Sequence, residues 1–374
     1  MSAAAAVFLL SVCFIVYVLA GYPALLFLWP VRRRVAALKR NPLSVSVILP
    51  VRNGEKWIAG KLESIAALDY PPELLQVIVI SDGSTDRTVE IASSYPGVEV
   101  LRIPASGKAA ALNVGIGRAT GELLFFTDVR QHLDRASLRA LVRRFDDPLV
   151  GVASGELFIR RGDCIEEESV GLYWKYEKAI RKRHAAIDSV LGATGCIYTM
   201  RRTLASPIPE DTLNDDMHLP FQAFFQGYRL DFVEEAKAYD VATALDAEFY
   251  RKVRTQAGVY QVISQFPKLL GPANRMWFHF VSHKLARLLL PFALLAALMA
   301  SLFLPAPWAA WALAAQAAGY GLAALDRWVP ERSALKRLTS LTHAFVILML
   351  AALAGALILF RSSRSFWKTP TAGT

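Results

Sequence analysis

Residues 75–88, which read LQVIVISDGSTDRT, place a run of strand-forming residues directly before a short acidic turn. A continuous run of Val and Ile is typical of a strand buried on both faces, and the Asp-Gly-Ser-Thr-Asp that follows ends such a strand and opens a helix. In open α/β sheets, ligands bind outside the carboxyl ends of the strands. The residues alone leave two interpretations of Asp82, Ser84 and Asp86: they contact a ligand, or they serve only as turn and helix-capping residues.

The same pattern of a strand followed by a polar turn recurs twice. Residues 45–50 (VSVILP) form a second apolar run, followed by Val-Arg-Asn-Gly-Glu, and residues 122–127 (ELLFFT) form a third that leads into Asp128. Between these segments, GKAAALN places Lys108 at the start of a helix-forming stretch. The sequence therefore predicts an α/β fold whose sheet edge collects Asp82, Asp128 and Lys108. Carboxylates at such an edge suit uracil, ribose or a metal ion, and a lysine suits phosphate.

The ordered set of these motifs, together with TLNDD at residues 212–216, resembles the family 2 glycosyltransferases with a GT-A fold, related to the cellulose, hyaluronan and poly-N-acetylglucosamine synthases. The resemblance covers residues 44–254. It implies a Rossmann-like, mostly parallel sheet and transfer of a sugar from a nucleotide diphosphate donor, a UDP-sugar, with inversion at the anomeric carbon. The donor-binding residues that it implies are Pro50, Asn53, Glu55, Asp82, Ser84, Lys108, Asp128, Arg130 and Arg254.

The resemblance also implies an acceptor side. An inverting transferase needs a base that takes the proton from the acceptor hydroxyl, and the family places it second in an acidic pair that begins a helix. That residue is Asp216 here, preceded by Asp215 where the family usually has Glu; N-capping of the helix is its other possible role. Upstream, a small-residue turn resembles the family's glycine-rich turn beside the sugar, although a plain tight turn fits equally well: Gly192, Ala193, Thr194 and Gly195.

Two departures from the family pattern bear on the cation and on the acceptor. The family's Asp-x-Asp reads Asp128-Val129-Arg130 here, which leaves Asp128 as the predicted ligand of Mg²⁺ or Mn²⁺. Arg130 could itself neutralise diphosphate charge, or it could point away and pair with Asp134. Where processive members carry Gln-x-x-Arg-Trp, Arg254 matches the arginine, while Tyr250 and Thr255 replace Gln and Trp.

The apolar residues are concentrated in long stretches. Hydrophobic residues make up 54% of the 374 residues, and residues 3–29, 285–304, 308–325 and 341–360 are each long and apolar enough to be candidate membrane spans. We therefore expect an N-terminal transmembrane helix at residues 1–30, a basic juxtamembrane linker at 31–43, the GT-A domain at 44–256, an amphipathic interface segment at 257–284, about three transmembrane helices at 285–360 and a polar tail at 361–374.

Basic residues set the expected orientation. Arg32, Arg33, Arg34, Lys39 and Arg40 follow the first span without an acidic neighbour, which predicts a multi-pass protein of the inner cell membrane with its catalytic domain in the cytoplasm. Three further spans would then place the C-terminus outside. The basic residues after the last span favour the inside instead: Arg361, Arg364 and Lys368. The loop at residues 326–337 also favours the cytoplasmic side and is the stronger constraint, because it carries Arg327, Arg332, Lys336 and Arg337.

Composition narrows the classes of partner. The net charge is +10, and the basic residues lie beside the candidate spans and in loops, without a recognisable nucleic-acid module. We therefore expect membrane lipids as a partner and not nucleic acid. We expect a nucleotide-sugar donor and a glycan or lipid-linked acceptor, in polysaccharide or glycolipid synthesis. Transfer of one sugar to a lipid acceptor without polymerisation is the alternative in the same class, and a transporter or scaffold with a degenerate nucleotide-binding domain is the alternative in another. The sequence leaves donor sugar, acceptor, linkage, processivity and oligomeric state open.

Overall fold

The computed structural model describes residues 2–32, 42–161, 164–165, 171–241, 245–330 and 333–366. The chain divides into two compact units. One unit comprises residues 31–169 and 184–242 and contains the sheet; the other comprises residues 1–30, 170–183 and 243–374 and is helical. Helix α7 (Gly171–Ile187) contributes to both. Predictions that rest on Arg33, Arg34, Lys39, Arg40 or Lys368 lie outside the described residues.

The first unit is built on one mixed sheet. Its strands are β1 (Val45–Val51), β2 (Leu75–Asp82), β3 (Val98–Ile103), β4 (Leu123–Phe126), β5 (His132–Leu133), β6 (Val150–Arg161), β7 (Cys164–Ile165), β8 (Tyr198–Arg201) and β9 (Arg229–Val241). Their order is β3-β2-β1-β4-β8-β6-β9-β5, with β7 paired to β6. Strands β1 to β4 are mutually parallel, whereas β8 runs antiparallel to β4 and β6. The predicted α/β class is confirmed; the predicted parallel pairing holds for β1 to β4, whereas β8 and β5 pair with their neighbours antiparallel.

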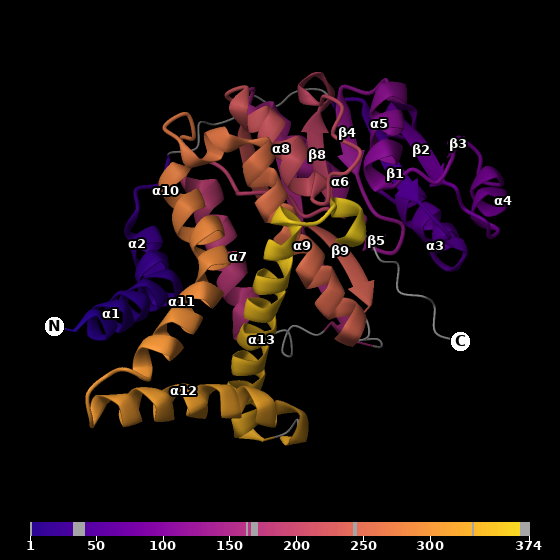
Figure 1. Ribbon diagram of the computed structural model, residues 1–374. Helices are drawn as coiled ribbons and strands as arrows, with labels where there is room; N and C mark the ends of the chain where they lie inside the picture. The colour runs from indigo at the N-terminus through magenta and orange to yellow at the C-terminus, as the bar shows by residue number, and fades with distance from the viewer. Residues whose placement is uncertain are drawn as a thin grey trace. The chain divides into compact units, whose positions relative to one another are not determined.

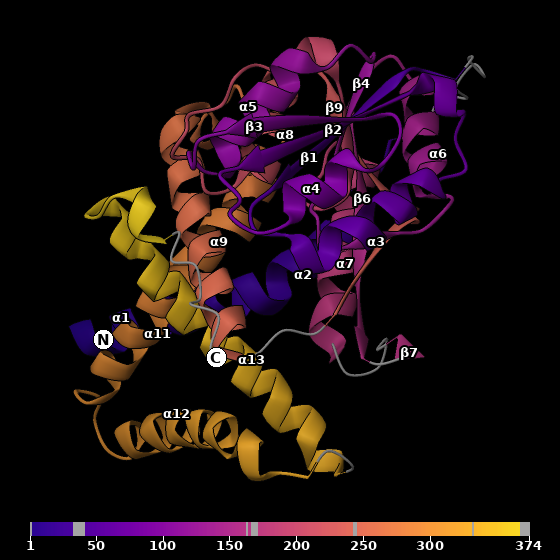
Figure 2. The same cartoon turned by 90° about the vertical axis from the view of Figure 1, so that its right-hand side faces the viewer.

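Helices cover both faces of the parallel half. The helices of this unit are α3 (Glu55–Ala66), α4 (Thr88–Ser93), α5 (Lys108–Arg118), α6 (Ser137–Val142) and α8 (Asp215–Phe225). Figures 1 and 2 show α3 and α4 on one face of β1 and β2 and α5 on the other. All seven residues of β1 are buried, because each of them faces one helical layer or the other. Gly115 allows α5 to approach closely, since a Cβ there would lie 2.7 Å from Ile48 Cγ2.

The sheet thereby brings the ends of β1, β2 and β4 to one edge. Val45 pairs with Leu75 on one side and Leu123 on the other, so these three parallel strands begin level and run in one direction; β4 ends opposite Ile48, three residues before the end of β1. The loops that follow them carry Asn53, Ser84 and Asp128. The edge predicted from the three strand-and-turn patterns therefore exists.

The second unit consists of helices. They are α1 (Ala3–Val16), α2 (Tyr22–Leu28), α9 (Leu245–Gln265), α10 (Trp277–His279), α11 (Ala286–Ser301), α12 (Trp308–Leu325) and α13 (Ala334–Gly355), with π-helical turns at Tyr17–Gly21 and Phe280–Leu285. Helix α1 packs on α11, and α13 packs on α9. The Arg183 guanidinium donates to the carbonyls of Leu26 (3.0 Å) and Phe27 (2.6 Å), so α7 caps the C-terminus of α2.

Within the described residues, three helices are long and apolar enough to cross a membrane: Ala3–Leu28, Trp277–Ser301 and Ala334–Leu359. Helix α12 is not among them, and both views show it running across the ends of α11 and α13. Its sequence places Gln316 and the run Gly319-Tyr320-Gly321 among the alanines, which lowers its apolarity. Within the described residues, the C-terminal part therefore holds two such helices, the first of which begins at Trp277; the number of spans and the interface segment at 257–284 stay predictions.

Candidate active site

Lys108 is the centre of the polar edge of the sheet. It is the first residue of α5, and its Nζ lies 3.0 Å from Asp128 Oδ1 and 3.2 Å from Asp215 Oδ1. Burial alone would lower the pKa of this ammonium, but the carboxylates of Asp128, Asp215 and Asp216 raise it well above its ordinary value. The lysine is therefore a fixed cation that joins the loop after β4 to the start of α8.

Asp82 holds Lys108 in place through the backbone. Its carboxylate is buried at the end of β2 and accepts hydrogen bonds from Ser106 N (2.6 Å) and Gly107 N (3.0 Å). Gly107 adopts φ +96°, a left-handed conformation that suits glycine and turns the chain into α5. The predicted donor-side aspartate thus anchors the turn that delivers Lys108.

The other predicted donor residues tie two loops together. Asn53 N donates to Ser84 Oγ (3.1 Å), and Asn53 Oδ1 accepts from Thr85 N (2.9 Å). Glu55 Oε2 accepts from Arg87 N (3.2 Å). Side-chain hydrogen bonds consequently cross-link the loops after β1 and β2. The sequence alone did not decide whether such turn residues bind a ligand or only stabilise the turn. Pro50 is buried in β1, directly before these loops.

Asp215 and Asp216 open α8, as the sequence predicts. The helix N-cap is Asn214, which excludes N-capping as the role of Asp216; its C-cap is Gln226, and Gly227 follows with φ +95°. Asp215 is buried, whereas Asp216 is partly exposed. The acidic pair therefore presents Asp216 to the outside of the site, with Asp215 held behind it by Lys108.

The predicted small-residue turn packs on Asp216. Ala193 N donates to the Asp216 carbonyl (2.7 Å), and a Cβ on Gly195 would lie 3.1 Å from Asp216 Oδ2. Gly192 has φ +132°, and Thr194 is fixed by bonds to Ser154 Oγ and the Gly155 carbonyl. The absence of a side chain at Gly195 leaves the space that the Asp216 carboxylate occupies.

The fold and this edge can now be compared with known proteins. The family model "Glycosyl transferase family 2" matches residues 46–206, and the model "Glycosyl transferase family group 2" matches residues 128–358, which is more than half of the chain. The chain is a family 2 glycosyltransferase. The family resemblance inferred from the motifs is confirmed.

Curated relatives of this glycosyltransferase include an N-acetylglucosaminyltransferase of Rhizobium sp. (strain N33), 29% identical over 53% of this chain and 48% of the relative. Another is a beta-monoglucosyldiacylglycerol synthase of Synechocystis sp. (strain ATCC 27184 / PCC 6803 / Kazusa), 25% identical over 58% of this chain and 48% of the relative. The chain thus spans about half the length of the curated relatives it matches. A mannosyltransferase from Pyrobaculum calidifontis, solved with GDP-mannose and Mn²⁺, has a TM-score of 0.69 at 22% identity and covers 93% of this chain and 99% of its own; it shows that the fold is GT-A.

The loop after β4 carries the residue that would hold a metal ion in this glycosyltransferase. Arg130, which stands where a second carboxylate would be, lies with Nη2 2.5 Å from Asp240 Oδ2 and does not pair with Asp134. Across the ranges that the structure describes, no three His, Cys, Asp or Glu side chains are grouped to hold a metal. Mg²⁺ and Mn²⁺ sites of this type need one or two carboxylates because substrate phosphates supply the other oxygens. Asp128, whose side chain is 38% exposed, therefore fits a metal shared with a bound diphosphate.

Arg254 is the one predicted site residue in the other unit. It lies on α9, where Arg251 and Lys252 both pair with Glu248 of the same helix. Its assignment to the donor pyrophosphate stays a prediction, as do the individual roles of the residues at the sheet edge.

The sequence analysis did not identify two buried residues near this edge of the sheet. Tyr198 of β8 stacks on Phe126, and its hydroxyl is buried without a hydrogen-bond partner in the described structure; burial, followed by the nearby Asp215, Asp216 and Asp128 carboxylates, raises its pKa. Lys61 of α3 is fully buried behind the Asp128 loop. The sequence held a signal for Lys61, because it lies at helical spacing with Ile58, Leu62 and Ile65 on the apolar face.

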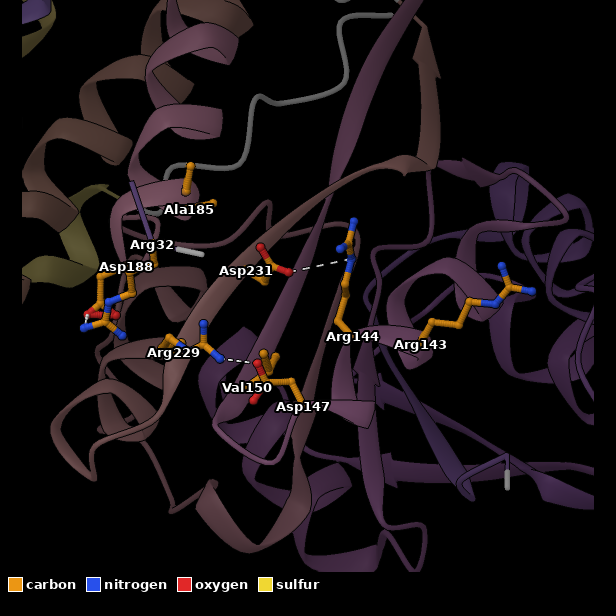
Figure 3. Close-up of a pocket in the computed structure, with 10 residues that line it drawn as sticks. Arg32, Arg143, Arg144, Asp147, Val150, Ala185, Asp188, Arg229 and Asp231 are labelled. Carbon is orange, nitrogen blue, oxygen red and sulfur yellow. Dashed lines mark hydrogen bonds and ion pairs between the residues drawn. The ribbon is translucent and has the colours of Figure 1, made fainter. Parts of the chain in front are cut away.

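A cavity of about 110 Å³ lies away from these residues. It opens beside Val150 and Arg229, at the starts of β6 and β9, which is the sheet edge opposite to Asp128. Figure 3 shows its charged side chains facing one another in pairs: Arg229 with Asp147, Arg144 with Asp231 (3.6 Å) and Arg32 with Asp188 (3.7 Å). Three of its four arginines already face aspartates, and Arg143 points away from them in Figure 3, so this cavity has the character of a salt-bridge cluster rather than of a nucleotide site.

Proposed function

We propose that this glycosyltransferase moves a hexosyl group from a UDP-sugar to a membrane-associated glycan or lipid-linked acceptor, with inversion. The observation that carries the proposal is the arrangement around Lys108. One fixed ammonium contacts Asp128 of the predicted donor side and Asp215 of the predicted acceptor side, and Asp216 follows at the open end. This arrangement joins a binding site for diphosphate to a base within one edge of the sheet.

Each residue then has a chemical task. Asp216 accepts the proton of the acceptor hydroxyl as that oxygen attacks the anomeric carbon. Lys108 faces the diphosphate that leaves, where a fixed positive charge stabilises the negative charge that develops. Asp215 orients Lys108, and Asp82 fixes the turn from which Lys108 projects. A divalent cation held by Asp128 and the donor phosphates would supply further neutralisation of the diphosphate.

The donor sugar that we favour is N-acetylglucosamine or glucose. The support is that the names of the relatives specify N-acetylglucosaminyl and glucosyl transfer. The small-residue turn is consistent with either sugar, because Gly192 and Gly195 leave the backbone open beside Asp216.

We further propose that the three apolar helices are membrane spans and that the sheet unit faces the cytoplasm, in an inner-membrane protein. With two spans after the sheet unit, the segment that follows Leu359 returns to the cytoplasmic side, in agreement with the basic residues Arg361 and Arg364. Helix α12 and its following turn then lie on the far side. This side differs from the one that the basic residues of the loop at 326–337 predict; of these residues, Lys336 pairs with Asp326 at 3.3 Å.

Transfer of a single sugar to a lipid acceptor is the second candidate. The observation in its favour is the substitution of Thr255 for the tryptophan that stacks on the acceptor sugar in processive relatives. The name of the Synechocystis relative, a glycolipid synthase, supports the same direction.

The test is a screen of UDP-sugars with the full-length protein in nanodiscs made from bacterial lipid. UDP release is measured first, and mass spectrometry of the lipid and glycan fractions then identifies the product. One sugar added to a lipid supports the second candidate, and a ladder of sugars supports polymer synthesis. UDP release that is equal in wild type and Asp216→Asn would contradict the proposed base.

A further inference from the structure

Lys61 is a lysine buried in the apolar layer between α3 and the sheet. Its residue is 1% exposed, and its neighbours on the same helix face are Ile58, Leu62 and Ile65. Nζ donates to Thr127 Oγ1 at 2.6 Å and to the Gln131 carbonyl at 2.7 Å. These two acceptors lie at the two ends of the loop that carries Asp128 and Arg130.

The bonds from Lys61 continue into the rest of the site. Thr127 Oγ1 donates in turn to the Cys196 carbonyl at 2.8 Å, directly after the turn that packs on Asp216. At the other end, Gln131 Nε2 donates to Asp240 Oδ2 at 2.8 Å, the same oxygen that Arg130 contacts. One amine therefore fixes both ends of the loop and, through Thr127, connects the loop to the Cys196 backbone.

Both faces of the sheet contribute a lysine to this loop. Lys108 reaches Asp128 from α5, whereas Lys61 reaches the two flanking residues from α3 on the opposite face. Burial lowers the pKa of Lys61 to about 7, while Cys196 and Asp128 act in the other direction. An amine has enough N–H groups for both bonds with or without its extra proton. The contact with the loop therefore persists across this titration.

Stability alone does not account for a lysine at this position. Removing an amine from water is costly, and replacement of buried charged groups by well-packed apolar side chains is frequently neutral or stabilising. Methionine has a similar length and would fill the same space between α3 and the sheet. What methionine cannot supply is the pair of hydrogen bonds to the Asp128 loop.

We propose that Lys61 is a positioning residue of the donor site: it sets the conformation of residues 127–131 and thereby the place at which the Asp128 carboxylate meets the donor diphosphate. This inference rests on the proposed function, in which Asp128 lies against that diphosphate. Lys61 itself touches neither donor nor acceptor, and it acts through Thr127 and Gln131.

The experiment measures two quantities on full-length protein in nanodiscs: the affinity for UDP with Mn²⁺ by calorimetry, and the melting temperature. Lys61→Met should bind UDP about tenfold more weakly while its melting temperature stays equal to or above that of wild type. The matched control is Lys56→Met, the same substitution at an exposed lysine of the same helix, which should leave both quantities unchanged.

Thr127→Val tests the link from the other side, since valine has the shape of threonine and lacks the hydroxyl. Thr127→Val should weaken UDP binding. In the double variant with Lys61→Met, the fold-loss of UDP affinity should be smaller than the product of the fold-losses in the two single variants. Wild-type UDP affinity in Lys61→Met would overturn the inference. A loss of UDP affinity accompanied by a lower melting temperature would overturn it as well. Asp128→Ala separates the two proposals. Unchanged UDP affinity in that variant would contradict the donor site itself. A loss of UDP affinity in Asp128→Ala without a loss in Lys61→Met would contradict only the role of Lys61.

Discussion

Substitution of Gly195 by alanine tests the position of the proposed base without changing its chemistry. The added methyl group would lie 3.1 Å from Asp216 Oδ2, whereas ordinary contacts of this kind begin at 3.4 Å. The carboxylate must therefore move by a few tenths of an ångström. Because a displacement of about 1 Å in an active site can cost about 100-fold in rate, we expect kcat to fall about tenfold.

Folding should survive this change. Gly195 is not in the left-handed region, so alanine there meets no backbone strain, in contrast to Gly192 at φ +132°. The free energy of unfolding should change by less than about 1 kcal/mol, because the entropy that alanine removes from the unfolded chain offsets part of the contact strain. UDP affinity should stay within about twofold of wild type, since the Asp128 side of the site is not touched.

The assay is UDP release under saturating donor, with calorimetric UDP binding and thermal melting on the same samples. Gly117→Ala is the matched control, because nothing lies within 4 Å of a Cβ at that helical glycine. If Gly195→Ala keeps the wild-type kcat while Asp216→Asn is inactive, the base is not held by this turn and the reasoning fails.

Three further outcomes follow from the same geometry. Asp216→Asn should lower kcat by about two to four orders of magnitude with near wild-type UDP affinity, measured by UDP release and calorimetry. Arg130→Met should cost about 3 kcal/mol in denaturant unfolding because Asp240, whose side chain is fully buried, loses the guanidinium that balances its charge and keeps the uncharged Gln131 amide, and Arg130→Met combined with Asp240→Asn should recover part of that loss. Since burial lowers the pKa of Lys61 to about 7, the unfolded chain binds the extra proton between pH 7 and 10; wild type should therefore gain stability relative to Lys61→Met as pH rises through that range, and a pH-independent difference would contradict the assigned pKa.

Short-range patterns were sufficient to predict the parallel half of the sheet. The apolar runs of β1, β2 and β4 are each followed by a polar turn, and parallel strands must deliver such turns to a common edge. The start of α8 at Asp215 could be predicted equally well, because an acidic first turn marks the beginning of a helix locally.

Partner choice across the fold could not be predicted from these patterns. Arg130 was expected to face diphosphate or Asp134, but it pairs with Asp240, which is 110 positions away in the chain. Asp82 was expected to face the nucleoside, and its carboxylate accepts from the Ser106 and Gly107 amides, which depend on the register of β2 and β3. Such contacts are set by the packing of separate strands, and sequence spacing does not encode them.

The sequence also did not predict how helix α12 is placed. Helix α12 carries no charge, which made it a candidate span, but it holds three leucines where α11 and α13 hold six each, so it is the less apolar helix. The placement of α12 across the ends of α11 and α13 follows from its packing against α13.

The cross-linked loops after β1 and β2 have a consequence for the thermodynamics of ligand capture. The bonds between Asn53 and the Ser84–Thr85 backbone and side chain, and between Glu55 and Arg87, join groups of the chain itself. Ordering of these loops is therefore complete before a nucleoside arrives, and the conformational entropy is lost during folding rather than during association. A preorganised rim of this kind favours a small entropic penalty on binding and an association rate set by collision and orientation rather than by loop closure.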